Sequence, residues 1–136
     1  MKKVLLFLFL LSVLLPITAD ERTEAEAARI AAEFTNSQPS LARAHRAPRK
    51  AASMKMAYRC PKKDNDAPAF YVFNQEDNAG YVIVSGDDRT EDVLLYTEQG
   101  QFDISKTNPN LRFWLNRLQE EITQANDSNA VDKTAP

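Results

Sequence analysis

Four acidic side chains gather in one short stretch of the chain and are the first candidates for chemistry. They lie within GYVIVSGDDRTEDVLLYTEQGQFD, residues 80–103, and are Asp87, Asp88, Glu91 and Asp92. A calcium loop of the helix-loop-helix kind needs oxygen ligands at alternating positions, a glycine sixth and a glutamate last, whereas Gly86 here precedes the acids. An irregular oxygen site stays open, although acids around a solvated turn are common and no flanking feature favours acid/base catalysis.

A cysteine nucleophile is the second candidate, because the chain has a single cysteine, Cys60, and a single histidine, His45. Thiol catalysis needs a base within hydrogen-bonding reach of the sulfur. His45 lies in a basic stretch with two prolines, and nothing near Cys60 suggests an oxyanion pocket. We favour a buried, small apolar role for Cys60 over a nucleophile or an intermolecular bridge. The sequence therefore predicts no catalytic residue, no metal site and no cofactor, in a protein that is not an enzyme.

The first 19 residues predict an export signal. Two lysines precede an apolar run from Val4 to Leu15, which Pro16 and small residues follow. This is the pattern of a secretory signal peptide, and the run is shorter than the roughly 20 residues that span a bilayer, which disfavours the alternative of a retained anchor. We expect a mature chain that begins at Asp20, is secreted into the periplasm or outside the cell, and has no membrane attachment after signal removal.

The remaining residues, 20–136, are enough for a single domain with one core. Apolar residues at helical spacing predict a helix over residues 21–34, and the proline-containing segment 35–50 is expected to be a flexible basic linker. A strand with period-two alternation follows over residues 53–60. Its side chains on one face would be Met54, Met56, Tyr58 and Cys60.

Further strands and a last helix complete the pattern. Residues 69–73 are apolar on both sides, which predicts a central strand that pairs with residues 81–84 as an antiparallel hairpin. Residues 92–96 form another strand, and residues 101–104 are a possible fifth. The segment 108–122 is a helix in which Asn108 caps and Pro109 takes the first position. Its apolar face consists of Leu111, Trp114, Leu115, Leu118 and Ile122.

These elements predict an α+β domain, an antiparallel four- to five-stranded sheet packed against an N-terminal and a C-terminal helix. Residues 125–136 are polar and are expected to be a tail. Charge is uneven along the chain: residues 34–63 contain eight cations and no acid, whereas residues 64–103 contain ten acids and Arg89 alone. Such segregation favours a charged protein partner. Because no aromatics alternate with the arginines and the net charge is −2, we do not expect nucleic acid as a partner.

Two stretches of the chain resemble a known family. AFYVFNQEDNAGYVIVSGDDRTEDVLLYTEQGQFD, followed by NPNLRFWLNRLQEEI, is similar to the propeptide of the streptopain-like cysteine proteases and to the small secreted inhibitors related to it. The likeness covers residues 69–122, with a looser likeness in ARIAAEF. Because VIVSGDDR looks like a signature of that fold, the resemblance implies that Asp87 and Asp88 are structural.

For function, the resemblance implies a domain that folds against a mature cysteine protease and blocks its cleft. The connection between the G-FD segment and the final helix is the part expected to approach the active site and disturb the catalytic histidine. The expected protease-contacting residues of this chain are Ser105, Lys106, Thr107, Asn108, Pro109 and Asn110. Either Asn108 or Asn110 would be the probing side chain, and Asn108 also has the role of a helix cap.

The expected partner is a streptopain-like cysteine protease, which the protein would inhibit as a separate chain. A truncated zymogen stays open, because the closing NAVDKTAP resembles a junction that leads into a catalytic domain. Two other functions stay open as well. One is a propeptide fragment that assists the folding of its protease and inhibits weakly, and the other is a generic secreted protein-binding module.

Overall fold

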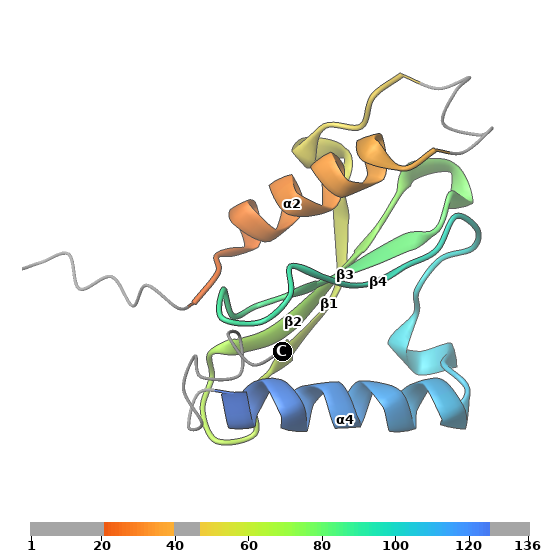
Figure 1. Ribbon diagram of the computed structural model, residues 1–136. Helices are drawn as coiled ribbons and strands as arrows, with labels where there is room; N and C mark the ends of the chain where they lie inside the picture. The colour runs from red at the N-terminus through yellow and green to blue at the C-terminus, as the bar shows by residue number, and fades with distance from the viewer. Residues whose placement is uncertain (1–20, 40–46, 126–136) are drawn as a thin grey trace, which may run out of the picture.

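The computed structural model describes residues 21–39 and 47–125. Two helices, α2 (Glu24–Ser37) and α4 (Pro109–Ala125), lie on opposite faces of one antiparallel sheet (Figure 1). This arrangement confirms the predicted α+β class. The predicted signal segment, His45 and the tail from residue 126 lie outside the described residues. No helix within the described ranges is long and apolar enough to cross a membrane.

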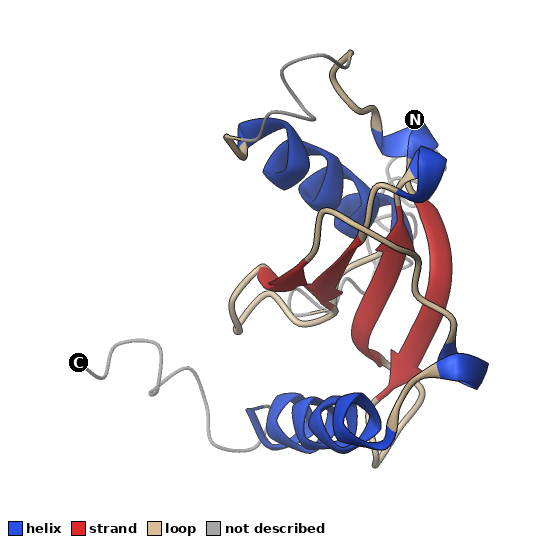
Figure 2. Ribbon diagram, turned by 90° about the vertical axis from the view of Figure 1, so that its right-hand side faces the viewer, coloured by secondary structure: helices blue, strands red, loops and turns tan. Residues whose placement is uncertain are grey.

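The sheet is a meander of four strands in the order β1-β2-β3-β4 (Figure 2). They are β1 (Lys55–Pro61), β2 (Pro68–Asn74), β3 (Tyr81–Ser85) and β4 (Val93–Tyr96). Strand β2 is buried on both faces and pairs with β1 and β3, so the predicted central strand and its antiparallel hairpin with β3 are confirmed. Strands β1 and β4 form the two edges.

The possible fifth strand at residues 101–104 does not form. The side chain of Asn74 binds both backbone groups of Phe102: its Oδ1 accepts from the amide at 2.7 Å and its Nδ2 donates to the carbonyl at 3.1 Å. These groups are therefore satisfied without a neighbouring strand. The Phe102 ring is buried, and the 3₁₀ helix η3 (Ile104–Lys106) follows directly.

Strand β1 differs from its predicted alternation. The register of its pairing with β2 shifts between Met56 and Tyr58, so the side chains before and after this bulge do not keep one face. Met54 belongs to the core beneath α2, Tyr58 and Cys60 pack on the α4 side, and Met56 is 40% exposed. The prediction that these four side chains share a face was wrong, because a bulge inserts one residue into the period of two.

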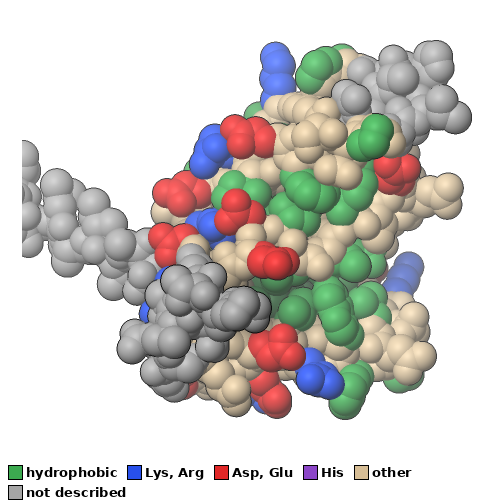
Figure 3. Space-filling view, viewed as in Figure 1, with side chains coloured by type: hydrophobic (Ala, Val, Ile, Leu, Met, Phe, Trp, Pro, Cys, Tyr) green, Lys and Arg blue, Asp and Glu red, His purple; other side chains and the backbone are tan. Residues whose placement is uncertain are grey.

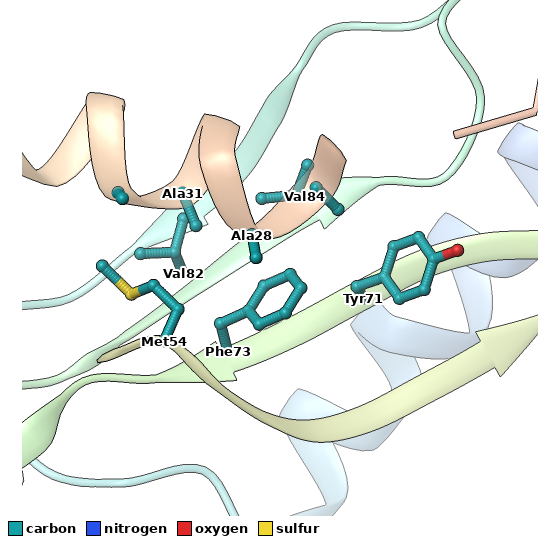
Figure 4. Close-up of a cluster of buried hydrophobic side chains, with 9 residues drawn as sticks. Ala28, Ala31, Met54, Tyr71, Phe73, Val82 and Val84 are labelled. Carbon is teal, nitrogen blue, oxygen red and sulfur yellow. The ribbon is translucent and has the colours of Figure 1, made fainter. Parts of the chain in front are cut away.

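Helix α2 packs its small side chains closely on the sheet. Ala28 and Ala31 point toward Phe73, Val82 and Val84 in the cluster that Figure 4 shows. The helix begins later than the predicted residue 21, because the side chain of the N-cap residue before it accepts from the backbone amide of Glu26 at 3.1 Å.

The end of α2 also lies three residues beyond the predicted 34. Thr35, at the start of the expected linker, is fully buried and its hydroxyl donates to the Ala31 carbonyl at 2.8 Å. Asn36 exchanges two hydrogen bonds with the backbone of Arg49, at 2.7 and 2.8 Å. Among the described residues, the two ends of the expected linker are therefore tied to each other.

Helix α4 covers the other face of the sheet. Leu115 and Ile122 are buried against a cluster that includes Phe70 and Ile83, and Leu111, Trp114 and Leu118 pack against it half-buried. The predicted apolar face is confirmed. The helix continues to Ala125, and its third-last residue, Thr123, accepts a hydrogen bond from the Lys63 amide at 3.0 Å, which fastens α4 to the end of β1.

Candidate functional site

The acidic segment after β3 is built around one buried carboxylate. Asp87 is fully buried, and its Oδ2 lies 2.8 Å from Lys62 Nζ and 2.7 Å from Arg89 Nη2. Its Oδ1 accepts from Nε and from the backbone amide of Arg89, at 3.0 and 2.9 Å. Both carboxylate oxygens are thus bound by cationic groups of the chain itself, and Asp87 acts as a structural ion-pair partner.

Arg22 connects the start of the domain to this segment. Its guanidinium is buried, donates to the carbonyls of Ser85 and Asp87 at 3.0 and 3.3 Å, and pairs with Asp92. Glu21 forms an isolated bridge with Asp87. The sequence offered no signal for this role of Arg22, because its partners lie more than 60 residues away.

Burial and the neighbouring cations act in opposite directions on the pKa of Asp87. Burial by itself raises the pKa of a carboxyl group, but hydrogen bonds from Lys62 and Arg89 to the ionised form outweigh it and hold the pKa of Asp87 below its ordinary value. Asp88, Glu91 and Asp92 are exposed around this buried centre. Within the described ranges, no group of three or more His, Cys, Asp or Glu side chains is placed to hold a metal ion.

The uneven charge of the sequence is partly neutralised within the fold. From the basic segment, Arg49 pairs with Glu76 at 3.6 Å and Lys62 with Asp87 at 2.8 Å, and both acids come from the acidic segment. Figure 3 shows basic side chains directly beside acidic ones on the visible face. The charge segregation seen along the chain is therefore weaker in space.

Cys60 is buried at the α4 side of the sheet, and its thiol donates to the Pro61 carbonyl at 3.5 Å. Burial raises the pKa of this thiol, which keeps it protonated. This environment agrees with the small apolar role that the sequence favoured for Cys60.

The segment expected to contact a protease connects the sheet to α4. It comprises η3, a short link and the first turn of the helix (Figure 1). Thr107 is half-buried, and the other expected contact residues are exposed: Ser105, Lys106, Asn108, Pro109 and Asn110. We call residues 105–110 the contact loop. The structure places these residues together on one continuous segment, while a contact with a protease stays a prediction.

Hydrogen bonds hold the start of the contact loop in one conformation. The Asp103 carboxylate accepts from the backbone amide and the hydroxyl of Ser105, at 2.9 and 2.6 Å, and the Asp103 carbonyl accepts from the Lys106 amide at 3.0 Å. The hydrogen bonds from the Ser105 side chain and amide lower the pKa of Asp103. Asp103 therefore caps η3 as an ionised group at neutral pH.

Arg112, on the first turns of α4, holds the middle of the loop through hydrogen bonds. Its Nε donates to Thr107 Oγ1 at 3.0 Å, and its Nη2 donates to the Ile104 carbonyl at 2.9 Å. The Thr107 hydroxyl in turn donates to the Ile104 carbonyl at 3.2 Å. The planar guanidinium thus joins helix and loop at two points. Because its donors have a fixed geometry, less side-chain entropy is lost for each hydrogen bond formed.

The two asparagines of the loop have different roles. Asn108 Oδ1 accepts from the Leu111 amide at 2.8 Å, so Asn108 is the N-cap of α4, as predicted. Asn110 is exposed in the first turn, and within the described residues no hydrogen bond involves its side chain. Beside the loop lies a pocket of about 200 Å³ whose lining includes Tyr81, Phe102 and Lys106.

Comparisons with known proteins support the coarser part of the resemblance, a domain like a protease inhibitor. The model of the Spi protease inhibitor family matches residues 19–122. The chain is also 30% identical over 132 residues to the thiol protease/hemagglutinin PrtT of Porphyromonas gingivalis, a match that covers 96% of this chain and 14% of that protein. The chain thus spans about one-seventh of this relative's length. No solved structure matches.

The family match bears on what the chain does. A family of protease inhibitors confirms the prediction that the chain is not an enzyme, and it implies a protease as the partner. Because the matched residues extend from the end of the predicted signal to Ile122 in the last helix, they include the whole sheet, α2, the contact loop and all but the last three residues of α4. This protein belongs to the Spi protease inhibitor family.

Proposed function

We propose that the protein is a secreted inhibitor of a streptopain-like cysteine protease and that it blocks the active-site cleft as a propeptide does. Family membership supports inhibition of a protease. The name of the similar protein PrtT, a thiol protease, supports a cysteine protease as the target. The predicted signal peptide supports secretion.

One observation carries the proposed mechanism, namely the braced conformation of the exposed contact loop. Asp103 caps the loop at its start, Arg112 holds its middle, and Asn108 caps the helix at its end. A segment that is already ordered avoids much of the entropy loss that a flexible peptide suffers on binding. A rigid, exposed loop on a folded domain is therefore suited to occupy a cleft without being rearranged.

Within this loop, Asn110 is the side chain that we expect to reach the protease. Asn108 uses its side-chain oxygen for the helix cap, whereas Asn110 is exposed and makes no side-chain hydrogen bond among the described residues. An amide that presents both a donor and an acceptor can bind polar groups around a catalytic centre. We therefore propose a structural role for Asn108 and a contact role for Asn110.

The proposal is tested by mixing the purified protein with streptopain and, separately, with PrtT, and by measuring hydrolysis of a peptide substrate. We expect loss of peptidase activity and a complex that elutes as one peak from a sizing column. Asn110→Ala should raise the inhibition constant without lowering the melting temperature. Asn65→Ala, an exposed asparagine in the β1–β2 connection, is the control for a change outside the loop and should leave inhibition unchanged. Its melting temperature is measured too, because the Asn65 side chain accepts a hydrogen bond from the Ala67 amide at 2.8 Å. Full activity of both proteases at micromolar excess of the wild-type chain would reject the proposal.

A second function, assistance in protease folding, is favoured by one observation. Nearly the whole chain matches a segment that makes up 14% of a thiol protease, as expected for a propeptide-like unit. The two functions separate in a refolding experiment with denatured protease. An assistant raises the yield of active enzyme after dilution even where the native enzyme is not inhibited.

A further inference from the structure

The contact loop is too small to form an inhibitory interface alone. Stable protein–protein interfaces bury about 800 Å² on each partner and involve roughly 20–30 residues a side. The loop supplies six residues, so a partner that touches it must also touch a neighbouring surface. The outer side of α4 adjoins the loop, because the helix begins within it at Pro109.

The outer side of α4 presents an apolar side chain that the fold does not use. Among the described residues, two large apolar side chains are exposed, Met56 at 40% and Phe113 at 65%. Phe113 does not belong to the face of α4 that packs on the sheet. Aromatic residues are enriched at interface centres, where a few of them contribute most of the binding free energy.

Helix geometry makes this aromatic ring continuous with the contact loop. Asn110 and Phe113 are three residues apart on α4, and Phe113 and Arg117 are four apart, so each pair lies side by side with Cβ atoms about 5–6 Å from each other. All three side chains are exposed. Arg117 also pairs with Glu121 at 3.5 Å, one turn further along the helix, and its side chain is still 62% exposed. A protein that contacts Asn110 from outside the helix therefore meets Phe113 next.

The charge of this region identifies the chemistry of the surface that it fits. Residues 104–119 contain Lys106, Arg112 and Arg117 and no acidic residue, while Asp103 precedes this stretch and Glu120 and Glu121 follow it. Lys106 and Arg117 are exposed on either side of Phe113 along the sequence. A complementary partner surface has an apolar depression with carboxylates at its rim.

We propose that the inhibitory surface extends from the contact loop onto the outer side of α4, with Phe113 as its apolar anchor and Lys106 and Arg117 facing acidic groups of the target thiol protease. This inference rests on the proposed function and adds to it the residue that dominates affinity. It also predicts that association is faster at low than at high salt, because exposed charges are screened.

The test compares inhibition constants of the full-length secreted protein and its variants against streptopain and PrtT. Phe113→Ala should raise the inhibition constant about 10-fold or more, the usual effect of truncating an interface aromatic. Phe113→Leu should recover part of the loss. Met56→Ala, the matched truncation of the other exposed apolar side chain, should leave the inhibition constant unchanged. Arg117→Glu should slow association with the protease and weaken the salt dependence of the association rate. Melting temperatures of all variants verify folding.

Each outcome bears on either the Phe113 anchor or the proposed inhibitory function. If the wild-type chain inhibits and Phe113→Ala inhibits equally well, the anchor is refuted and the proposed function stands. If the wild-type chain inhibits neither protease, the function and the anchor fall together. A wild-type chain that dimerises in sedimentation, with Phe113→Ala monomeric and equally inhibitory, would assign the ring to a second copy and overturn the inference.

Discussion

The buried pair of Asp87 and Lys62 allows a stability prediction with a worked magnitude. Asp87 is fully buried and the Lys62 side chain is 5% exposed, with 2.8 Å between Nζ and Oδ2. Replacing Asp87 by alanine leaves an ammonium group buried without its counter-ion. Removing one partner of a buried pair costs about 3–5 kcal/mol of unfolding free energy, a large share of the roughly 5–15 kcal/mol that stabilises a domain.

Urea unfolding, followed by the fluorescence of the single tryptophan, Trp114, measures this effect. Small domains lose about 1–3 kcal/mol of stability per molar urea, so a loss of 3–5 kcal/mol lowers the unfolding midpoint by at least about 1 M. The double variant Asp87→Ala/Lys62→Met should be more stable than Asp87→Ala alone, because it contains no unpaired buried lysine.

The matched control is the exposed pair of Lys63 and Glu120, which has the same 2.8 Å separation but side chains that are 48% and 52% exposed. Glu120→Ala should cost no more than about 1 kcal/mol, as surface pairs do. Equal losses for Asp87→Ala and Glu120→Ala would refute the reasoning that burial, rather than distance, determines the contribution of an ion pair here.

Three further predictions concern pH, backbone conformation and the helix cap. Because the pKa of Asp87 is lowered in the folded state, the ionised carboxylate stabilises the fold fully above the unfolded pKa of about 3.9, and this stabilisation is lost as pH falls through the lower folded pKa. Urea midpoints measured from neutral pH downward should therefore decline at acidic pH. The decline should be smaller in Asp87→Asn. Gly100→Ala should lower the unfolding free energy by about 1–2 kcal/mol because of its φ of 84° alone. Gly80→Ala should cost about 1–3 kcal/mol more in thermal unfolding, since its Cβ would lie 2.0 Å from the Thr97 carbonyl oxygen. Equal losses in the two variants would contradict the steric clash at Gly80. Asn108→Ala should lower the unfolding free energy by about 1 kcal/mol and Asn108→Ser should restore most of it, and a loss in both variants would show that more than the cap is involved.

Much of the architecture follows from local pattern. The apolar run of β2 predicts its central place, because a strand covered on both faces can be apolar on both. The spacing of the apolar residues in α4 predicts the face that it buries, and Asn108 followed by Pro109 predicts where that helix starts. The contact loop has no such local signal, and its residues were expected from the family resemblance alone.

Other features needed partners that lie far apart in the chain. The four acids after β3 have similar neighbours in sequence, yet Asp87 alone among them is buried, because Lys62 comes from another connection and Arg22 from the start of the domain. The bulge in β1 arises from pairing with β2, and the missing fifth strand reflects the bonds from Asn74 to Phe102.

The sequence by itself determined the central strand, the buried face of α4 and the residue at which that helix starts, since hydrophobic periodicity and caps are set by residues within a few positions of each other; the contact loop was expected from the family resemblance. Only the tertiary structure decided which carboxylate is buried, which strand face each side chain of β1 takes, and that Arg112 braces the loop from behind. These depend on groups brought together by folding, whose energies come from burial and distance in space and leave no local pattern.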